Sequence, residues 1–455
     1  MPESNGLRRV LGPWSAAAIV VGTIIGSGIF AVPKAMVTSV GSVKLVFLVW
    51  VVGGLLSLFG ALSYAELGAA MPEAGGEYVY LREAYGPVWG FLYGWTQTWV
   101  AKSGSIATMA TVFFSYLANF QPELDAVCYV IRLPIGPGGG PLEIRYGQLL
   151  AVMVILILAG VNYLGAKWGG AVQVLVTAVK LSSLVAIIAV GLGAGRGSAA
   201  NLGSAISAAG GVTGFFAALV AALWAYDGWN NLSMAGSEVI RPQRNLPLAL
   251  IAGTLAAMVI YLATNLAYFY VLSAGEVAAS DRVAAEMMRH VLGSAGAAAV
   301  SVAVMVSVLA ALNGSILSGA RVPYAMARDG RFFKVAARVS PAFATPGVSI
   351  LVLSLWASLL VFSGRFEQLF TYVMFASWIL YGMTAAAVIV LRRKRPRLAR
   401  PYRTIGYPIV PLLFLLGASC VVFSTLLHAP RESLMGLVLI LSGLPFYFHW
   451  KRKTL

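Results

Sequence analysis

Long, charge-poor stretches of apolar residues, separated by short charged connections, extend along almost the whole of this chain. They cover residues 10–33, 45–65, 84–118, 146–166, 168–195, 205–237, 246–275, 291–320, 339–364, 368–391, 404–427 and 433–450. Most of them reach the length of roughly 20 residues that a helix needs to cross a bilayer. The pattern therefore predicts an all-α polytopic membrane protein with about 12 transmembrane helices and with loops too short for a sizeable soluble domain.

The first apolar stretch carries an interruption in its middle, at Gly26-Ser27-Gly28. Two glycines and a serine form a helix poorly, because glycine loses much conformational freedom and serine competes for backbone hydrogen bonds. In hydrocarbon an unpaired backbone amide is costly, so such a break is tolerated only where it faces protein or a wet cavity. The interruption indicates either backbone groups held free for a ligand or close helix packing, since Gly22 and Gly26 also form a GxxxG pair.

A second interruption lies in the middle of the sixth stretch. It places an ionisable side chain and a glycine inside the sequence Trp224-Ala225-Tyr226-Asp227-Gly228-Trp229-Asn230-Asn231. An ionisable residue in mid-span is costly and usually functional. Two interrupted spans in corresponding positions of two halves are the best sequence indication of a secondary transporter's substrate site.

The positions of the two interruptions also predict how the chain is organised. They fall in the first and the sixth stretch, which divides the first ten spans into five plus five. We therefore expect a first unit at residues 1–195, a second unit at residues 196–395, and a final pair of helices at residues 396–455 without a counterpart.

Composition supports the membrane assignment. The chain has 455 residues, of which 59% are hydrophobic and only 11% are charged, a balance that no ordinary soluble protein has. The net charge of +16 is compatible with nucleic-acid binding, but the basic residues flank the apolar spans, so membrane topology explains them and no nucleic acid is expected. The two cysteines, Cys128 and Cys420, form no metal or redox pattern.

The distribution of lysine and arginine predicts the orientation. If the N-terminus is cytoplasmic, the cytoplasmic connections hold most of these residues, including the cluster at 392–403 and the tail at 451–453. Positive charge favours the cytoplasmic side of a membrane protein. We therefore expect a multi-pass protein of the cell (inner) membrane with both termini in the cytoplasm.

A break at Gly26-Ser27-Gly28 would expose complementary backbone groups. The outer half-helix would begin with the free amides of Ser27, Gly28 and Ile29, which attract a carboxylate. The inner half-helix would end with unpaired carbonyls near Thr23, Ile24 and Ile25, which suit an ammonium group. Together these groups match the zwitterion of an α-amino acid, and the second break adds carbonyls near Trp224, Tyr226 and Asp227.

Two side chains in the second break have more than one interpretation. Asp227 is placed either to bind a cation, a proton or a polar network, or to cap the half-helix that follows, since aspartate is a favoured N-cap. Trp224 is placed either to close over a bound substrate or to pack as an ordinary aromatic residue of a span.

Two lysines lie inside predicted spans. Lys180 has about twelve apolar or small residues on either side, and a charge at that depth must face the bundle interior and find oxygen partners. It is a candidate for a fixed ammonium in the place of a bound sodium ion, or for a titrating group, or for a structural ion pair. Lys102 is more ambiguous, although Ser103, Gly104 and Ser105 make that helix face small and polar.

Signs of an enzyme are absent from the sequence. The three histidines lie in loops or at a span end, and no HExxH, GxSxG, CxxC or phosphate-binding lysine motif occurs. We therefore expect no catalytic residues, no metal and no cofactor.

Several local sequences resemble one known family along essentially the whole chain. They are Gly26-Ser27-Gly28-Ile29-Phe30, Tyr64-Ala65-Glu66-Leu67, Pro72-Glu73-Ala74-Gly75-Gly76-Glu77-Tyr78, Trp224 to Asn230, Glu238 to Pro247, Leu312-Asn313-Gly314-Ser315 and Arg321 to Gly330. Together they resemble the amino acid–polyamine–organocation (APC) superfamily, in particular bacterial relatives of the L-type amino acid transporters (the LAT family).

This resemblance implies a leucine-transporter-type fold with five-plus-five inverted repeats, in which helices 1 and 6 are broken. It implies that the Ser27 and Gly28 amides bind the substrate carboxylate and that carbonyls of Ile24, Trp224 and Asp227 bind the amino group. The candidate substrate-binding residues are Ile24, Gly26, Ser27, Gly28, Ile29, Ser105, Trp224, Tyr226, Asp227 and Asn230, and the candidate coupling residues are Lys180 and Ser307.

The function implied is sodium-independent exchange or facilitated transport of amino acids, by default neutral L-amino acids. Small ones fit if Trp224 and the third span narrow the pocket. A proton-coupled importer remains an alternative, as does a membrane nutrient sensor of the same fold. Animal members of the family join a glycoprotein through a cysteine in the loop that here contains Cys128, but the short termini look prokaryotic, so no heavy-chain partner is expected.

Overall fold

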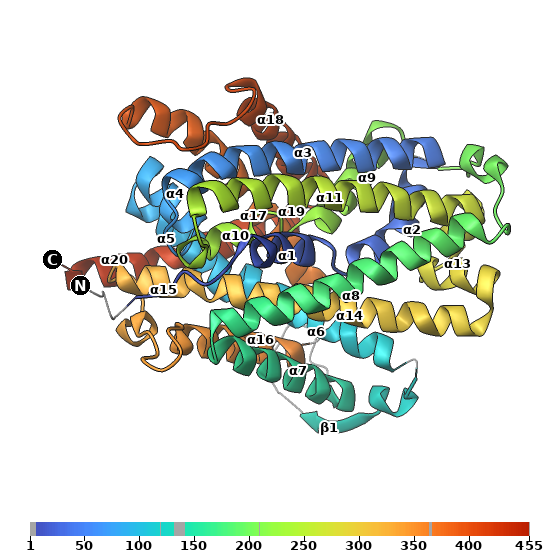
Figure 1. Ribbon diagram of the computed structural model, residues 1–455, viewed down its shortest axis with the longest axis horizontal. Coiled ribbons are helices and arrows are strands. Elements are labelled where there is room, and N and C mark those ends of the chain that lie inside the picture. Colours follow the sequence, from blue (N-terminus) through green and yellow to red (C-terminus); the bar gives the residue numbers. More distant parts are fainter. Residues whose placement is uncertain (1–5, 119, 132–141, 209, 364–365, 455) are drawn as a thin grey trace.

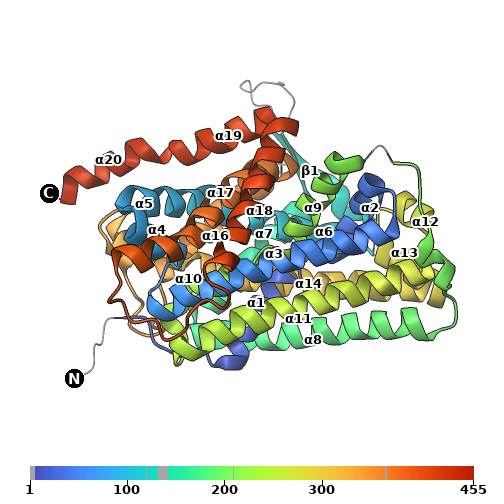
Figure 2. The same ribbon diagram turned by 90° about the horizontal axis from the view of Figure 1, so that it is seen from above.

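The computed structural model describes residues 6–118, 120–131, 142–208, 210–363 and 366–454. Four long helices run roughly along the long axis of the molecule (Figures 1 and 2). They are α3 (Val43–Ala70), α8 (Ala166–Gly193), α11 (Pro242–Val271) and α14 (Ser294–Gly319). The first described residues and the end of the last helix lie at the same end of this axis (Figures 1 and 2).

Nine helical segments of the described residues are long and apolar enough to cross a membrane: Pro13–Val40, Val43–Ala70, Tyr146–Tyr163, Ala166–Gly193, Pro242–Val271, Ser294–Arg328, Phe375–Lys394, Ile409–Leu427 and Pro430–Arg452. Gly211–Tyr226 and Gly347–Phe362 are shorter apolar helices. The predicted stretch 84–118 is not among them because a π-helix, η1 (Gln97–Ala101), divides it. The protein is therefore a polytopic helical membrane protein.

Both interruptions of the sequence separate two helices. The first lies between α1 (Pro13–Ile24) and α2 (Gly28–Val40), and the second lies between α9 (Gly211–Tyr226) and α10 (Asn231–Met234). The remaining α-helices are α4 (Glu77–Tyr85), α5 (Pro87–Thr96), α6 (Lys102–Leu117), α7 (Tyr146–Tyr163), α12 (Ala274–Ala279), α13 (Val283–Leu292), α15 (Arg321–Arg328), α16 (Gly347–Ser363), α17 (Phe366–Lys394), α18 (Ile409–His428), α19 (Pro430–Leu441) and α20 (Gly443–Thr454). Short 3₁₀ helices are η2 (Pro122–Asp125), η3 (Ala199–Gly203), η4 (Gly236–Glu238) and η5 (Lys334–Ala337).

A short hairpin departs from the expected all-α fold in the described part of the chain. β1 (Val127–Ile131) pairs antiparallel with β2 (Leu142–Arg145), and Cys128 lies on the first of these strands. The hairpin lies outside the helix bundle (Figure 1). It therefore does not change the helical arrangement around the two breaks.

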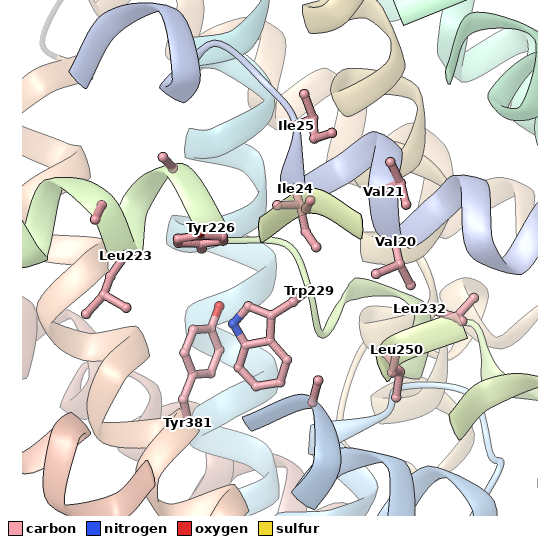
Figure 3. Packing of buried hydrophobic residues seen from close by; sticks show 14 of the residues in the cluster. Val20, Val21, Ile24, Ile25, Leu223, Tyr226, Trp229, Leu232, Leu250 and Tyr381 are labelled. Atoms are coloured by element: carbon pink, nitrogen blue, oxygen red, sulfur yellow. The ribbon is translucent and has the colours of Figure 1, made fainter. Parts of the chain in front are cut away.

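The broken helices lie in the centre of the bundle. α1 packs against α8, α11 and α14, and α2 packs against α9. Close to the breaks, Val20 and Ile24 of α1, Leu232 of α10 and Leu250 of α11 belong to one buried cluster that also contains Tyr226 and Trp229 (Figure 3). Gly253 of α11 permits this approach, because a Cβ atom there would lie 2.7 Å from Val20.

A fully buried ion pair fixes the chain that follows the second break. Arg321 Nε donates to Glu238 Oε2 at 2.6 Å and Nη2 donates to Oε1 at 2.9 Å, and neither side chain is exposed. This two-bond geometry is the strong form of an arginine–carboxylate contact. It connects the end of η4 to the start of α15, and so anchors the segment after α10.

We expect Arg321→Met to lower the free energy of unfolding by about 3–5 kcal/mol, because it leaves the Glu238 carboxylate buried without a counter-charge. The midpoint of thermal unfolding of the purified protein in detergent measures the change. The double variant Arg321→Met/Glu238→Leu removes both charges and should recover most of the loss. A single variant as stable as the wild type would contradict the assignment.

Candidate functional site

The break between α1 and α2 leaves free donors on its outer side. α2 starts with hydrogen bonds from the amides of Phe30 and Ala31 to the Ser27 carbonyl, at 3.1 and 3.2 Å. The preceding amides have no acceptor within their own helix, because the first turn of a helix offers none. These amides belong to Ser27, Gly28 and Ile29. They give this side of the break a positive partial charge, which favours an anionic group such as a carboxylate.

The end of α1 on the other side of the break is held by a lysine and a serine. Lys180 Nζ donates to the Gly22 carbonyl at 2.9 Å and also to the Ile25 carbonyl. Ser307 Oγ lies 3.1 Å from the Ile25 carbonyl and 3.1 Å from the Gly26 carbonyl. The structure thus brings the two predicted coupling residues together at one carbonyl oxygen. Lys180 is 1% exposed, so its ammonium neutralises the negative end of α1 without contact with solvent.

Lys180 belongs to a polar stripe of α8 that sequence reasoning missed. Gln173 Nε2 and Thr177 Oγ1 lie 3.2 and 3.3 Å from the carbonyl oxygen of Ala18, one turn earlier on α1. The spacing of Gln173, Thr177 and Lys180 is i, i+4, i+7, which places all three on one face of a helix. That spacing was visible in the sequence and is the signal that would have found the stripe.

A tyrosine of α11 connects the two breaks. Tyr261 Oη lies 2.8 Å from the Ile24 carbonyl, at the end of α1, and 2.7 Å from the Ala225 carbonyl, near the end of α9. A hydroxyl carries one proton, so it donates to one of these carbonyls at a time. Tyr261 was not predicted, because a tyrosine inside an apolar span has no periodic signal that distinguishes it from a packing residue.

Glycines allow the two breaks to touch. A Cβ atom on Gly28 would lie 2.7 Å from Ala225 Cα, and one on Gly228 would lie 2.9 Å from the Thr23 carbonyl. Gly228 has φ +105°, which only glycine adopts readily, and its carbonyl accepts a hydrogen bond from Thr23 Oγ1 at 2.9 Å. Close packing at the first break thus involves Gly28 and also Gly22, where a Cβ atom would overlap Gln173 Nε2, whereas one on Gly26 would meet only Ala311 at 3.8 Å.

A small pocket of about 60 Å³ lies between the two breaks, much smaller than the cavity of about 600 Å³ around Arg82 and Asp329. Its lining residues come from α1, α2, α6, α9, α10 and α14 and from the breaks between them. They are Thr23, Ile24, Gly26, Ser27, Gly28, Lys102, Ser105, Thr108, Met109, Trp224, Ala225, Asp227, Gly228, Asn231, Ala311 and Ser315. Seven of the predicted substrate-binding residues lie in this lining: Ile24, Gly26, Ser27, Gly28, Ser105, Trp224 and Asp227.

Three predicted substrate-binding residues lie outside the lining. Tyr226 is fully buried, and its hydroxyl donates to the Trp50 carbonyl at 3.1 Å. The Asn230 side chain donates to a carboxylate oxygen of Glu77. Ile29 is buried in the hydrophobic core. Each of these three residues is adjacent in sequence to a residue of the pocket lining, but its own side chain is not part of that lining.

Asp227 does not cap α10, because the N-cap position belongs to Asn230, which makes no side-chain capping bond. The Asp227 carboxylate instead accepts a hydrogen bond from the Tyr381 hydroxyl at 3.1 Å. This contact is compatible with the first interpretation of Asp227, in which it binds a cation, a proton or a polar network. Trp224 lies in the pocket wall, where both of its predicted roles remain compatible with its position.

Other lining residues were missed although their spacing was informative. Ala311 and Ser315 follow the predicted Ser307 at intervals of four, and therefore share its face of α14. Thr108 and Met109 continue the α6 face that begins with the predicted Ser105. Extending each predicted residue along its own helix face would have found them.

The donors at the start of α2 and the carbonyl acceptors at the end of α1 give the pocket two opposite polar ends. The zwitterion of an α-amino acid is complementary to these ends, because its carboxylate pairs with the donors and its ammonium pairs with the acceptors. Lys102 and Asp227 add one positive and one negative side chain to the lining. The group of residues is therefore suited to bind a zwitterion and shows no arrangement of nucleophile and base.

Comparison with known proteins adds independent information. A family model described as amino acid permease matches residues 11–442. The serine/threonine exchanger SteT of Bacillus subtilis is 34% identical over 99% of this chain and 99% of its own length. The human b(0,+)-type amino acid transporter 1 is 35% identical over 99% of this chain and 90% of its own, and the human cystine/glutamate transporter is 30% identical over 99% and 87%.

We expect Gly28→Ala to destabilise the protein by about 1–3 kcal/mol, because the new methyl group overlaps the Ala225 backbone. Gly26→Ala is the matched control, since its Cβ meets only Ala311 at 3.8 Å, an ordinary contact. Thermal unfolding of the two purified variants measures the difference. Equal stability of the two variants would show that the breaks do not approach each other at Gly28.

Proposed function

The chain belongs to the amino acid permease family of the APC superfamily, and on that basis we propose that it exchanges neutral L-amino acids by alternating access, without sodium. Amino acid transport across a membrane, rather than enzymatic catalysis, follows from the family. Exchange, sodium independence and the choice of substrate are our proposal. The observation that carries it is the position of Lys180.

Lys180 supplies a permanent cation at the point where α1 ends. Its ammonium hydrogen-bonds the Gly22 and Ile25 carbonyls, and Ser307 approaches the Ile25 carbonyl from α14. A sodium ion in this place would need the same oxygen atoms as ligands. Because the protein itself occupies them, external sodium is not required to hold the inner part of the broken helix.

The backbone of the two breaks is suited to recognise the common part of an amino acid. The carboxylate binds at the amides of Ser27, Gly28 and Ile29, where the start of α2 carries positive partial charge. The ammonium binds on the opposite side, near the carbonyls of Ile24, Trp224 and Asp227. Tyr261 donates only one proton to two carbonyls, so acceptor capacity remains for the substrate.

The side-chain end of the pocket favours small neutral substrates. Hydroxyl groups of Ser105, Thr108 and Ser315 line it together with Trp224, and its volume is about 60 Å³. Lys102 and Asp227 balance each other, so the lining has no net charge to attract a charged side chain. The Bacillus relative is named as a serine/threonine exchanger, which agrees with this substrate class.

We also propose that the membrane spans are arranged as two inverted repeats. Residues 1–195 and 196–395 form two inverted repeats of five spans, each beginning with a broken helix, and residues 396–455 add two spans, for about 12 crossings. The excess of positive charge in the loops on the N-terminal side supports our proposal that both termini lie in the cytoplasm. The protein works in the cell (inner) membrane without a heavy-chain glycoprotein.

We expect purified protein in proteoliposomes to accumulate labelled serine or alanine only when unlabelled amino acid is present inside. Replacing external sodium with choline should leave the rate unchanged, because Lys180 already occupies the cation position. Accumulation into empty vesicles driven by an inward proton gradient would support the proton-coupled alternative. A strict requirement for sodium would overturn the proposal.

Replacing Lys180 with alanine should lower the exchange rate at least tenfold, because the inner end of α1 loses the cation that holds it. Substrate affinity should fall less, since Lys180 does not line the pocket. Lys167→Ala, which removes an exposed lysine from the same helix, is the matched control and should exchange at the wild-type rate. Exchange in proteoliposomes and substrate binding in detergent separate the two effects.

A further inference from the structure

α10 is too short to hold its own position. It has four residues, Asn231–Met234, whereas isolated helices below roughly 12–15 residues are marginal even in favourable sequences. It follows directly on the second break and contributes Asn231 to the pocket lining. Its place must therefore be determined by contacts with other elements, and α14, α1 and α11 pack against it.

Two buried charged side chains of opposite sign contact the start of α10. Lys102 Nζ donates to Asn231 Oδ1, and Asn230 Nδ2 donates to Glu77 Oε1. The oxygen of a side-chain amide accepts hydrogen bonds and its nitrogen donates them. Asn231 therefore binds the lysine with its oxygen, and Asn230 binds the glutamate with its nitrogen. Hydrogen bonds to a charged partner are stronger than neutral ones. All four side chains are 6% exposed or less.

The other end of α10 is held by the residues that precede Glu77. The Gly75 amide donates to the Met234 carbonyl at 2.8 Å. A Cβ atom on Gly76 would lie 2.7 Å from the backbone of Ser233, so the chain before α4 passes directly against the backbone of α10. Gly76 has φ +52°, which favours glycine. The segment 75–77 thus contacts the end of α10 at Met234 and Ser233 and, through Glu77, the residue before α10, Asn230.

Local structure explains how the two charges reach this place. Glu77 is the first residue of α4, where the helix dipole favours a carboxylate. Lys102 is the first residue of α6, directly after the π-helix η1. Single π-turns widen a helix and are frequent at functional sites. Lys102 also lines the pocket, whereas Glu77 does not.

We propose that Lys102 and Glu77 are positioning residues, which hold α10 through Asn231 and Asn230 and thereby set the inner wall of the substrate pocket. The proposal rests on the transport function proposed above. Lys102 lies close enough to interact with the carboxylates of both Glu77 and Asp227, so the loss of Lys102 affects two buried acidic side chains. Because Glu77 has no place in the pocket lining, its effect on the substrate passes through α10.

The test combines single and double replacements. Lys102→Met or Glu77→Leu alone leaves the other charge buried with less compensation, so each should lower both thermal stability and exchange. Lys102→Met/Glu77→Leu removes one positive and one negative charge and leaves only Asp227 without its lysine, so it should be more stable than Lys102→Met alone, while exchange stays at least tenfold slower because α10 is no longer held. Recovery of both properties would show a purely structural ion pair and overturn the proposal.

A milder replacement keeps the test valid if Glu77→Leu does not fold. Glu77→Gln retains an oxygen that accepts the Asn230 bond, so it should exchange faster than Asn230→Leu, which removes the donor. Binding of serine to the detergent-solubilised variants supplies a second measurement. If Lys102→Met weakens serine binding while Glu77→Gln and Asn230→Leu leave binding and exchange unchanged, Lys102 acts on substrate alone and the proposal fails.

The experiment separates this proposal from the transport proposal. Wild-type protein that binds serine but does not exchange it would contradict the proposed function. In that case, the proposal for α10 still predicts weaker serine binding in Asn230→Leu, although Asn230 is outside the pocket. Lys167→Met serves as the control for loss of a lysine, because this exposed residue lies far from α10 in sequence and contacts solvent.

Discussion

The structure depends on a constraint of the hydrocarbon environment: a helix that stops in mid-membrane must find partners for the backbone groups that it leaves unpaired. At the first break these partners are side chains of neighbouring helices, namely Lys180 for Gly22 and Ile25, and Ser307 for Ile25 and Gly26. The donors at the start of α2 remain directed to the gap. The protein thus satisfies the Gly22, Ile25 and Gly26 acceptors with its own side chains, whereas the donors at the start of α2 have no partner in their own helix.

The two breaks form one unit rather than two sites. Gly28 packs on the backbone of Ala225, Thr23 donates to the Gly228 carbonyl, and Tyr261 reaches a carbonyl from each break. A movement of α1 relative to α9 therefore changes both sides of the pocket together. This coupling follows from main-chain contact, which glycine makes possible, and it needs no long-range pathway.

Sequence reasoning located the breaks because glycine and an isolated charge are informative in an apolar background. It identified Lys180 for the same reason, since a lone ammonium in mid-span requires oxygen partners. It did not identify Tyr261, because a tyrosine in a span looks the same whether it packs or bridges. Tyr226 and Asn230 were assigned to the pocket but point elsewhere, since adjacent helical positions differ by about 100° around the axis. The direction of each side chain depends on how the helices pack against each other, which the sequence pattern does not contain.

The two buried lysines, which both lie in the first half of the chain, solve the same physical problem at two different breaks. Lys180 holds the end of α1, and Lys102 holds the start of α10, and both donate to neutral amide-type oxygens rather than to carboxylates. In contrast, the fully buried Arg321 is paired with a carboxylate, Glu238, away from the breaks.

This difference matches what each position must do. A hydrogen bond between a charged group and a neutral one contributes about 1.5–3 kcal/mol, whereas breaking a buried ion pair costs about 3–5 kcal/mol. In the alternating-access cycle proposed above, a half-helix exchanges its contacts repeatedly. The lysine–amide bonds at the ends of α1 and α10 suit that exchange better than a buried ion pair such as Arg321–Glu238.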